Sequence, residues 1–204
     1  MKKTIVLLSM LTVLACKKNE EKKDEPGIMD AVEGVSNLNK AGDALKDFEK
    51  QQEKLKAMTP ISNDVLKNVL TEELGGLKRA HFNAGDASMM GLATADAKYT
   101  NEESGKEVAV SIMDGAGESG SSIISLTVMA LSMNVESIND TETKKTETIN
   151  GIKCLTEDDT NPEYIKSSIT FIYKDRYQVA LRGTKINLDE LKSYMKNLDL
   201  SKLD

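Results

Sequence analysis

The 204-residue chain contains no tryptophan, one histidine, two cysteines and only 4% aromatic residues. The core must therefore be built from aliphatic residues, methionine and alanine. One histidine and two cysteines are too few for a structural zinc site, which takes four such ligands. A net charge of −6 without a basic cluster argues against a nucleic-acid partner, because phosphates require grouped lysine and arginine. The length fits one domain with a tail.

The N-terminus has the features of an export signal. Lys2 and Lys3 precede an apolar run that ends at Cys16 and is too short to cross a membrane as an ordinary helix. Residues 12–16, Thr-Val-Leu-Ala-Cys, resemble the lipobox of bacterial lipoproteins. In that family the leader is cut before the cysteine, which then carries acyl chains on its sulfur and usually on its amine. The alternative is a plain secretory signal that ends in cysteine by chance.

The resemblance implies that residues 1–15 are a signal peptide and that lipidation of Cys16 anchors the mature chain to a bilayer. Cys154 then has no partner for an internal disulfide. Residues 16–28 are mostly charged and read as a solvated tether. Lys17, directly after the cysteine, resembles outer-membrane sorting in Gram-negative bacteria. We therefore expect an uncharacterised type of envelope lipoprotein in the outer membrane, on its periplasmic face or at the cell surface.

Residues 29–58 predict a long helix. Ala31, Leu38 and Leu45 repeat every seven residues, and the opposite face is charged. Such a stripe either packs against the protein's own domain, with the helix folded back or standing as a stalk, or joins a second copy in a coiled coil. The seam is short and contains alanine and glutamine, which disfavours the coiled coil.

Hydrophobic periodicity predicts an α+β domain over residues 59–204. The expected helices cover residues 64–73, 121–135 and 187–198. The expected strands cover residues 92–100, 107–113, 142–149, 152–156, 168–173 and 177–182, with a short candidate at 80–83. Asn150-Gly151 is the strongest hairpin signal. Because hairpins dominate and no βαβ repeat is present, we expect an antiparallel sheet of about six strands with helices packed on one face.

This order of elements resembles the PsbP and Mog1-like lipoprotein folds, in which helices back a curved antiparallel sheet. The resemblance is one of topology, without a shared motif, so it implies no function.

A glycine motif follows the strand over residues 107–113. Gly115, Gly117 and Gly120 fit the G-x-G-x-x-G pattern of dinucleotide sites, with Glu136 and Asp140 at plausible distances for a ribose carboxylate. However, the preceding strand alternates instead of being apolar on both faces, and no βαβ unit follows. We interpret the motif as a strand-to-helix turn that needs positive φ. The backbone amides over residues 119–122 would at most hold a small anion weakly.

Three other groups of residues contain side chains that can take part in catalysis or binding. His81 is the only histidine, so a Ser-His or Cys-His pair would have to use it, and nothing in the sequence places it near Cys154 or a nucleophilic serine. The acidic stretch at residues 157–161 lacks the ligand spacing of a calcium loop and reads as a solvated loop. Five tyrosines can line a groove or pack across strands; they are Tyr99, Tyr164, Tyr173, Tyr177 and Tyr194.

With no metal cluster, catalytic triad or carboxylate pair in the sequence, we expect no enzyme activity, no metal and no cofactor. The expected function is a non-catalytic binding or assembly role for an envelope protein partner. The alternative is a carrier of a hydrophobic molecule, in a cavity between the sheet and helix 121–135 lined by Met129, Met133, Val110 and Ile172. An extracytoplasmic enzyme is the third hypothesis, and it needs His81 beside Cys154 or an acid in a cleft.

Overall fold

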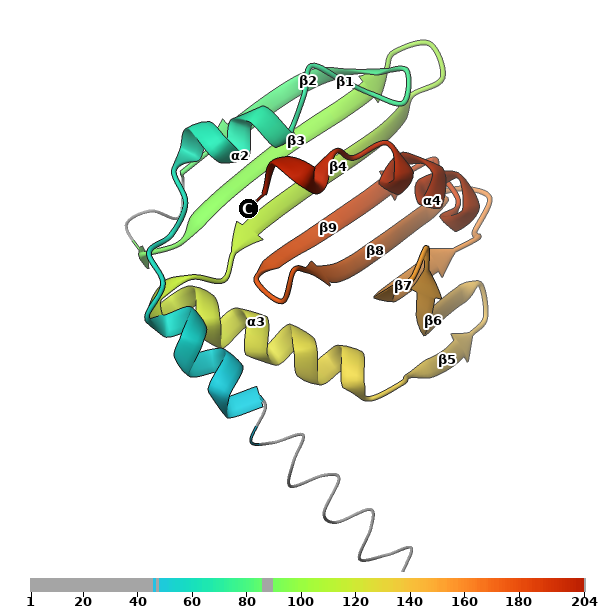
Figure 1. The fold of residues 1–204 in the computed structure, drawn as a ribbon. Helices are drawn as coiled ribbons and strands as arrows, with labels where there is room; N and C mark the ends of the chain where they lie inside the picture. Colours follow the sequence, from blue (N-terminus) through green and yellow to red (C-terminus); the bar gives the residue numbers. More distant parts are fainter. Residues whose placement is uncertain (1–45, 47, 86–89, 204) are drawn as a thin grey trace, which may run out of the picture. The chain divides into compact units, whose positions relative to one another are not determined.

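The computed structural model describes residues 46, 48–85 and 90–203, which belong to one unit, Asp43–Asp204. In this part of the chain, the fold is an antiparallel sheet in the order β1-β2-β3-β4-β9-β8-β7-β6-β5 with helices around it (Figure 1). The strands are β1 (Glu73–Leu74), β2 (Leu77–Ala84), β3 (Ala93–Asn101), β4 (Lys106–Asp114), β5 (Glu136–Asn139), β6 (Glu142–Ile149), β7 (Ile152–Asp159), β8 (Lys166–Tyr173) and β9 (Tyr177–Thr184). The helices are α2 (Asn63–Val69), α3 (Gly117–Ser132), α4 (Leu188–Lys196), the 3-10 turn η2 (Leu200–Lys202) and an N-terminal helix over residues 48–56.

The predicted α+β class and antiparallel pairing are confirmed, but the prediction of about six strands is wrong. The described sheet has nine strands. One of the unexpected strands is β1, which has two residues and turns into β2 through Gly75 and Gly76, both at positive φ. The other is β5, whose four residues are all exposed, so it lacks the alternation that marks a half-buried strand.

Local turn chemistry explains the hairpin that the sequence marks most clearly. Asn150 and Gly151 have φ of 52° and 81°, and they join β6 to β7 with Ile149 paired to Ile152. Both residues tolerate positive φ, as a two-residue hairpin turn requires. This prediction is confirmed, and it sets the register of the two strands.

One face of the sheet, which we call the core face, packs against α2, α4 and η2. The inward residues of the central strands meet the apolar sides of these elements to form the main core. Its largest fully buried side chains are Tyr99, Tyr177, Phe171, Leu66, Leu70, Ile112, Ile169, Leu181, Ile186, Leu191 and Leu203. Asn187 caps α4 by accepting a hydrogen bond from the Glu190 amide, as expected for a helix that starts at residue 187 or 188.

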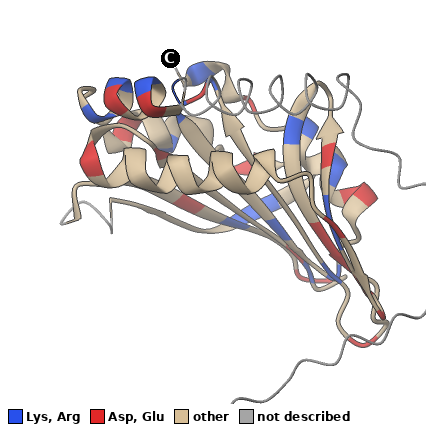
Figure 2. Cartoon of the chain, turned by 90° about the horizontal axis from the view of Figure 1, so that it is seen from below, with Lys and Arg blue, Asp and Glu red and all other residues tan. Residues whose placement is uncertain are grey.

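The prediction that helices pack on one face is wrong. Helix α3 lies against the opposite face, which we call the open face, near the ends of the strands. The Thr127 hydroxyl donates a hydrogen bond of 2.6 Å to Gln178, and α3 packs against Met113 and Ile172. These three strand residues alternate with core-face residues, so they point the other way. Apolar residues on both sides of the strand ends therefore allow a helix to pack on each face. Helix α3 has one charged residue, and it is almost entirely uncharged in the view from below (Figure 2).

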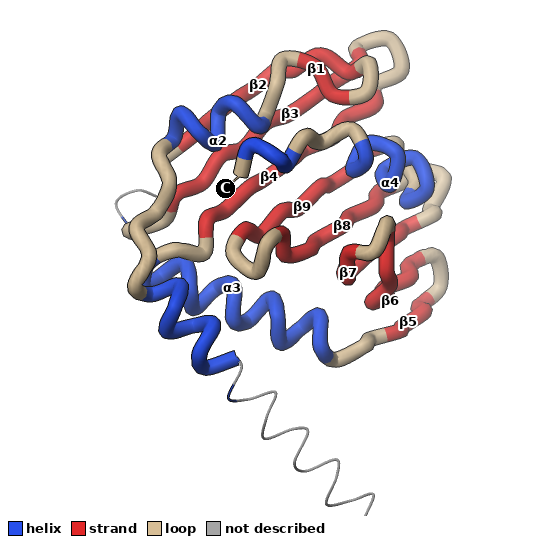
Figure 3. Tube along the Cα trace, viewed as in Figure 1, coloured by secondary structure: helices blue, strands red, loops and turns tan. Residues whose placement is uncertain are grey.

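The described part of the N-terminal helix comprises residues 46 and 48–56, so the expected long helix from residue 29 is not matched. Residues 29–45 lie outside the described residues. Leu55, near the end of this helix, is buried against Leu92, Met113 and Ile124. The helix therefore contributes to the packing around α3, and Figure 3 shows the two helices at the same end of the sheet.

A buried carboxylate joins the segments that meet at this end. Asp114, the last residue of β4, is 0% exposed and accepts two hydrogen bonds of 2.7 Å from Arg176 in the β8–β9 turn. It also accepts hydrogen bonds from the amides of Ile61, at 2.8 Å, and Ala116, at 3.0 Å. The hydrogen bond with Asp114 raises the pKa of Arg176 above its usual value. A buried charge is tolerated when it is paired and hydrogen-bonded in this way.

Replacing Asp114 should be strongly destabilising. Asp114→Ala leaves the Arg176 guanidinium without its partner, and we expect a loss of about 3–5 kcal/mol in the free energy of unfolding. Urea denaturation followed by circular dichroism measures this loss. The matched control is Glu157→Ala, which breaks the exposed Lys144–Glu157 pair and should change stability by less than about 1 kcal/mol. Equal losses in the two variants would contradict the role assigned to Asp114.

Candidate functional site

The part of the open face beyond α3 carries a row of polar side chains. The strand register places Lys144, Glu157, Ser168 and Arg182 opposite one another across β6, β7, β8 and β9. Lys144 forms an ion pair of 2.6 Å with Glu157, which also accepts a hydrogen bond of 3.5 Å from the Ser168 hydroxyl. No described helix covers this row, so its polar groups face solvent.

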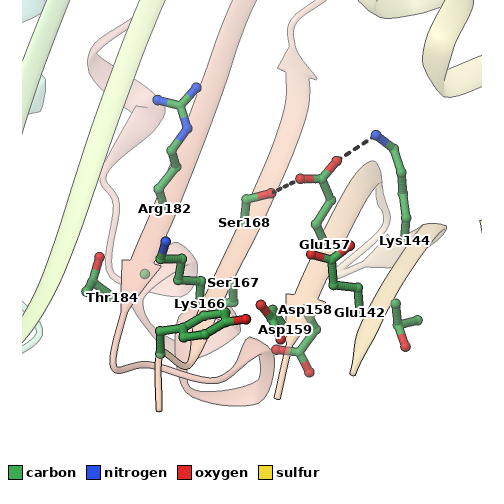
Figure 4. Close-up of a pocket in the computed structure, with 13 residues that line it drawn as sticks. Glu142, Lys144, Glu157, Asp158, Asp159, Lys166, Ser167, Ser168, Arg182 and Thr184 are labelled. Atoms are coloured by element: carbon green, nitrogen blue, oxygen red, sulfur yellow. Dashed lines mark hydrogen bonds and ion pairs between the residues drawn. The ribbon is translucent and has the colours of Figure 1, made fainter. Parts of the chain in front are cut away.

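An open groove of about 600 Å³ follows this row toward the strand ends where β8 begins and β9 finishes (Figure 4). The segment between β7 and β8 forms one wall and brings Tyr164 into the groove, with its side chain 49% exposed. The lining residues are Glu142, Thr143, Lys144, Glu157, Asp158, Asp159, Tyr164, Lys166, Ser167, Ser168, Arg182, Gly183 and Thr184. We call this feature the open-face groove.

The acidic side of the groove, on β6 and β7, is largely engaged in the fold itself. Asp158 accepts a hydrogen bond of 3.1 Å from the Leu188 amide at the start of α4, and burial raises the pKa of Asp158. Asp159 accepts hydrogen bonds from the Thr141 hydroxyl, at 2.8 Å, and from the Asn161 amide, at 3.0 Å. These two carboxylates therefore hold the groove wall in place.

The basic side of the groove, on β8 and β9, has spare hydrogen-bonding capacity. Lys166 and Arg182 lie on neighbouring strands and point to the open face. Among the described residues, neither has an ion-pair partner, although the Lys166 ammonium lies 5.7 Å from the centre of the Tyr164 ring. Two cations and an exposed aromatic ring thus face the acidic wall across a polar groove.

No protein-family model, curated protein or solved structure matches this chain. The function must therefore be argued from the arrangement of its own residues.

The structure does not bring His81 and Cys154 together. His81 is exposed on β2, whereas Cys154 is fully buried on the core face of β7, and four strands separate them. Five strand spacings amount to about 24 Å. Burial raises the pKa of the Cys154 thiol to about 11, so the thiol stays protonated and unreactive at neutral pH.

The glycine motif forms a tight corner between β4 and α3, as the sequence interpretation predicted. Gly117 has a φ of +82°, and a Cβ at Gly120 would lie 2.7 Å from the Asp114 carbonyl oxygen. The sheet around it is antiparallel, unlike that of a dinucleotide fold. The glycines therefore allow close packing at the corner where Asp114 is buried.

The remaining residues that the sequence suggests for a site are either buried in the core or exposed on the surface. Within the described residues, no group of three or more histidine, cysteine and acidic side chains is placed to hold a metal ion. Tyr99 and Tyr177 are buried in the core, and Tyr173 pairs with Tyr177 across the β8–β9 hairpin. Tyr194, on α4, packs against the main core, so Tyr164 is the one of these five tyrosines that lines the groove.

The cavity expected for a hydrophobic carrier is not formed by the proposed residues. Val110 is buried on the core face, whereas Ile172 points to the open face beneath α3. Met129 and Met133 are 50% and 67% exposed on the outer side of α3. The sheet itself separates the proposed lining residues.

The predicted lipidation site, Cys16, lies outside the described residues. In the described part of the chain, no helix is both long enough and apolar enough to cross a bilayer.

The buried thiol predicts a pH dependence of stability. Above about pH 9 the unfolded chain loses the Cys154 proton, whereas the folded chain keeps it up to about pH 11. The unfolded state then binds fewer protons, so the free energy of unfolding falls by about 1.4 kcal/mol per pH unit within this window. Below it the thiol contributes no slope. Urea denaturation between about pH 9 and pH 11 measures the free energy of unfolding of the unmodified chain and of Cys154→Ala. The fall with pH that is due to the thiol should be absent from Cys154→Ala. The same pH dependence in both proteins would contradict the prediction.

Proposed function

We propose that the protein is a lipid-anchored lipoprotein of a Gram-negative outer membrane and that its domain binds an envelope protein without catalysing a reaction. The open-face groove is the observation that supports the binding role. It is polar, accessible and held by strands on both sides, and the described residues that line it include no thiol or histidine. Such a surface suits recognition of a partner better than covalent chemistry.

The charge distribution of the groove supports a polypeptide partner. Four acidic residues and Lys144 lie on the β6–β7 side, and Lys166 and Arg182 lie on the β8–β9 side. An extended segment that carries charges of both signs complements such a groove, because opposite potentials then face each other across the interface. Tyr164 adds a flat, partly apolar surface of the kind enriched at binding sites.

The anchoring proposal is supported by the positive leader, the apolar run and the small residue before Cys16. We expect mass spectrometry of the chain from a Gram-negative host to find an N-terminal peptide that begins at acylated Cys16. Cys16→Ser should remove acylation and release the chain from the membrane fraction. Cys154→Ser is the matched control and should leave both properties unchanged. An unacylated chain with its leader still attached would refute the anchor.

The binding proposal predicts site-specific cross-linking through the groove. A photoreactive phenylalanine at Tyr164 in the full chain should form a discrete adduct with one envelope protein in intact cells. Arg182→Glu should reduce this adduct by about tenfold, because it replaces an attractive contact with a repulsive one. The adduct is detected by immunoblotting and identified by mass spectrometry.

Two controls separate the groove from the rest of the surface. Lys78→Glu makes the same change in charge on the open face but outside the groove, and it should leave the adduct intact. A photoreactive residue at Ile138, which is 72% exposed on β5, should not capture the same protein. Equal capture from both positions, or equal loss in both charge variants, would rule out the groove as the binding site.

A further inference from the structure

The basic side of the open-face groove contains four side chains that donate hydrogen bonds. The antiparallel register places Lys166 opposite Thr184 and Ser168 opposite Arg182, and all four line the groove. The two cations therefore occupy one diagonal of a square, and the two hydroxyls occupy the other. Diagonal neighbours on paired strands lie about 7–8 Å apart, so the long side chains of lysine and arginine can both reach one small ligand. We call these four residues the donor square.

The two cations of the donor square differ from other cations on the same face of the sheet. Lys98 and Lys144 each form an ion pair with a glutamate on the neighbouring strand, at 3.1 and 2.6 Å. Within the described residues, Lys166 and Arg182 form no such pair. Figure 4 shows them on one side of the groove, with Lys144 and Glu157 on the other. An anion held between Lys166 and Arg182 would relieve the repulsion of their charges.

The carboxylate that the register places opposite Lys166 belongs to Asp159. Its Oδ1 atom accepts the hydrogen bonds from the Thr141 hydroxyl and the Asn161 amide. The Lys166 ammonium lies 5.7 Å from the centre of the Tyr164 ring and is not paired with Asp159. Asp159 therefore leaves the donors of Lys166 available to a ligand.

The charges around the donor square favour a ligand with a single negative charge. Lys166 and Arg182 together with Asp159 leave an excess of one positive charge, because two cations stand against one acid. Asp159 and, one strand further, Glu142 would repel the second negative charge of a phosphate group. A carboxylate carries one negative charge, and its two oxygens match the parallel N–H groups of a guanidinium.

We propose that the donor square holds one carboxylate group. The Arg182 guanidinium donates to both oxygens, and Lys166 and the hydroxyls of Ser168 and Thr184 supply the remaining donors. In the proposed complex the carboxylate belongs to the bound polypeptide, so the inference rests on the proposed function of the groove. An acidic side chain and a free C-terminus both carry this group, and the experiments below distinguish them.

Arginine modification tests the donor square in the full chain without a partner. Phenylglyoxal attaches to accessible arginines, and the chain contains three, Arg79, Arg176 and Arg182. We expect about 100 mM acetate to slow the modification of Arg182 by about twofold relative to chloride at the same ionic strength, because the bound carboxylate occupies the guanidinium. Mass spectrometry of proteolytic peptides measures the rate. Arg79, which donates to the Leu70 carbonyl, is the internal control and should react equally in both salts.

Two variants and a second anion show whether this protection comes from the donor square. Lys166→Gln should abolish the protection of Arg182 by acetate. Lys78→Gln makes the same change on the open face outside the groove and should preserve the protection. Inorganic phosphate should protect Arg182 less than acetate does at the same ionic strength. No protection by acetate, or stronger protection by phosphate, would overturn the inference.

An exchange of charges tests whether the bound polypeptide supplies the carboxylate. The photoreactive residue at Tyr164 identifies the captured segment of the envelope protein. Lys166→Gln should reduce this adduct by about fivefold, because one of the two cations is lost. The loss caused by Arg182→Glu should be reversed when an acidic residue of the captured segment is changed to lysine. If the captured segment ends at the C-terminus of the envelope protein and no such change restores the adduct, two added residues at that terminus should reduce the adduct of the unmodified chain.

These outcomes separate the inference from the proposed function. An adduct that survives Lys166→Gln, and that neither the charge exchange nor the extended terminus affects, overturns the carboxylate site and leaves binding in the groove in place. Protection of Arg182 by acetate without any adduct from Tyr164 in intact cells has the opposite meaning. It supports the carboxylate site and contradicts the envelope protein as its source.

Discussion

The buried carboxylate of Asp114 is the constraint on which the arrangement of this domain depends. It ends β4 and accepts hydrogen bonds from three other parts of the chain: the linker before α2, the start of α3 and the β8–β9 turn. A charge with no exposed surface requires all of these donors at once. The close glycine corner beside it allows α3 to begin against the sheet. The position of α3 on the open face therefore depends on the contacts of Asp114 and on this corner.

The covered and uncovered parts of the open face explain where a site can form. At one end of the strands, Met113 and Ile172 point to this face and require α3 as a cover. Toward the other end, the same face carries Ser168 and Arg182 and stays in solvent. The result is a sheet that buries apolar side chains on both sides at one end and presents polar ones at the other, with the open-face groove among them.

The sequence predicts those features that depend on local chemistry. The Asn150-Gly151 turn, the alternation in β4, β8 and β9 and the cap of α4 all follow from near neighbours. Features that depend on distant partners were missed. The sequence does not show which strand end α3 covers, because that choice depends on Asp114 meeting Arg176. Lys166 and Arg182 become a pair of cations only through the β8–β9 register, although their alternation with buried residues is a signal that they share a face.

The open-face groove and a second groove beside the N-terminal helix lie at opposite ends of β8 and β9. The N-terminal helix and the β8–β9 turn lie at one end of the sheet, and the open-face groove lies where β8 begins and β9 finishes. An eight-residue strand of this kind spans about 25 Å, so two ligands at its ends do not exclude each other.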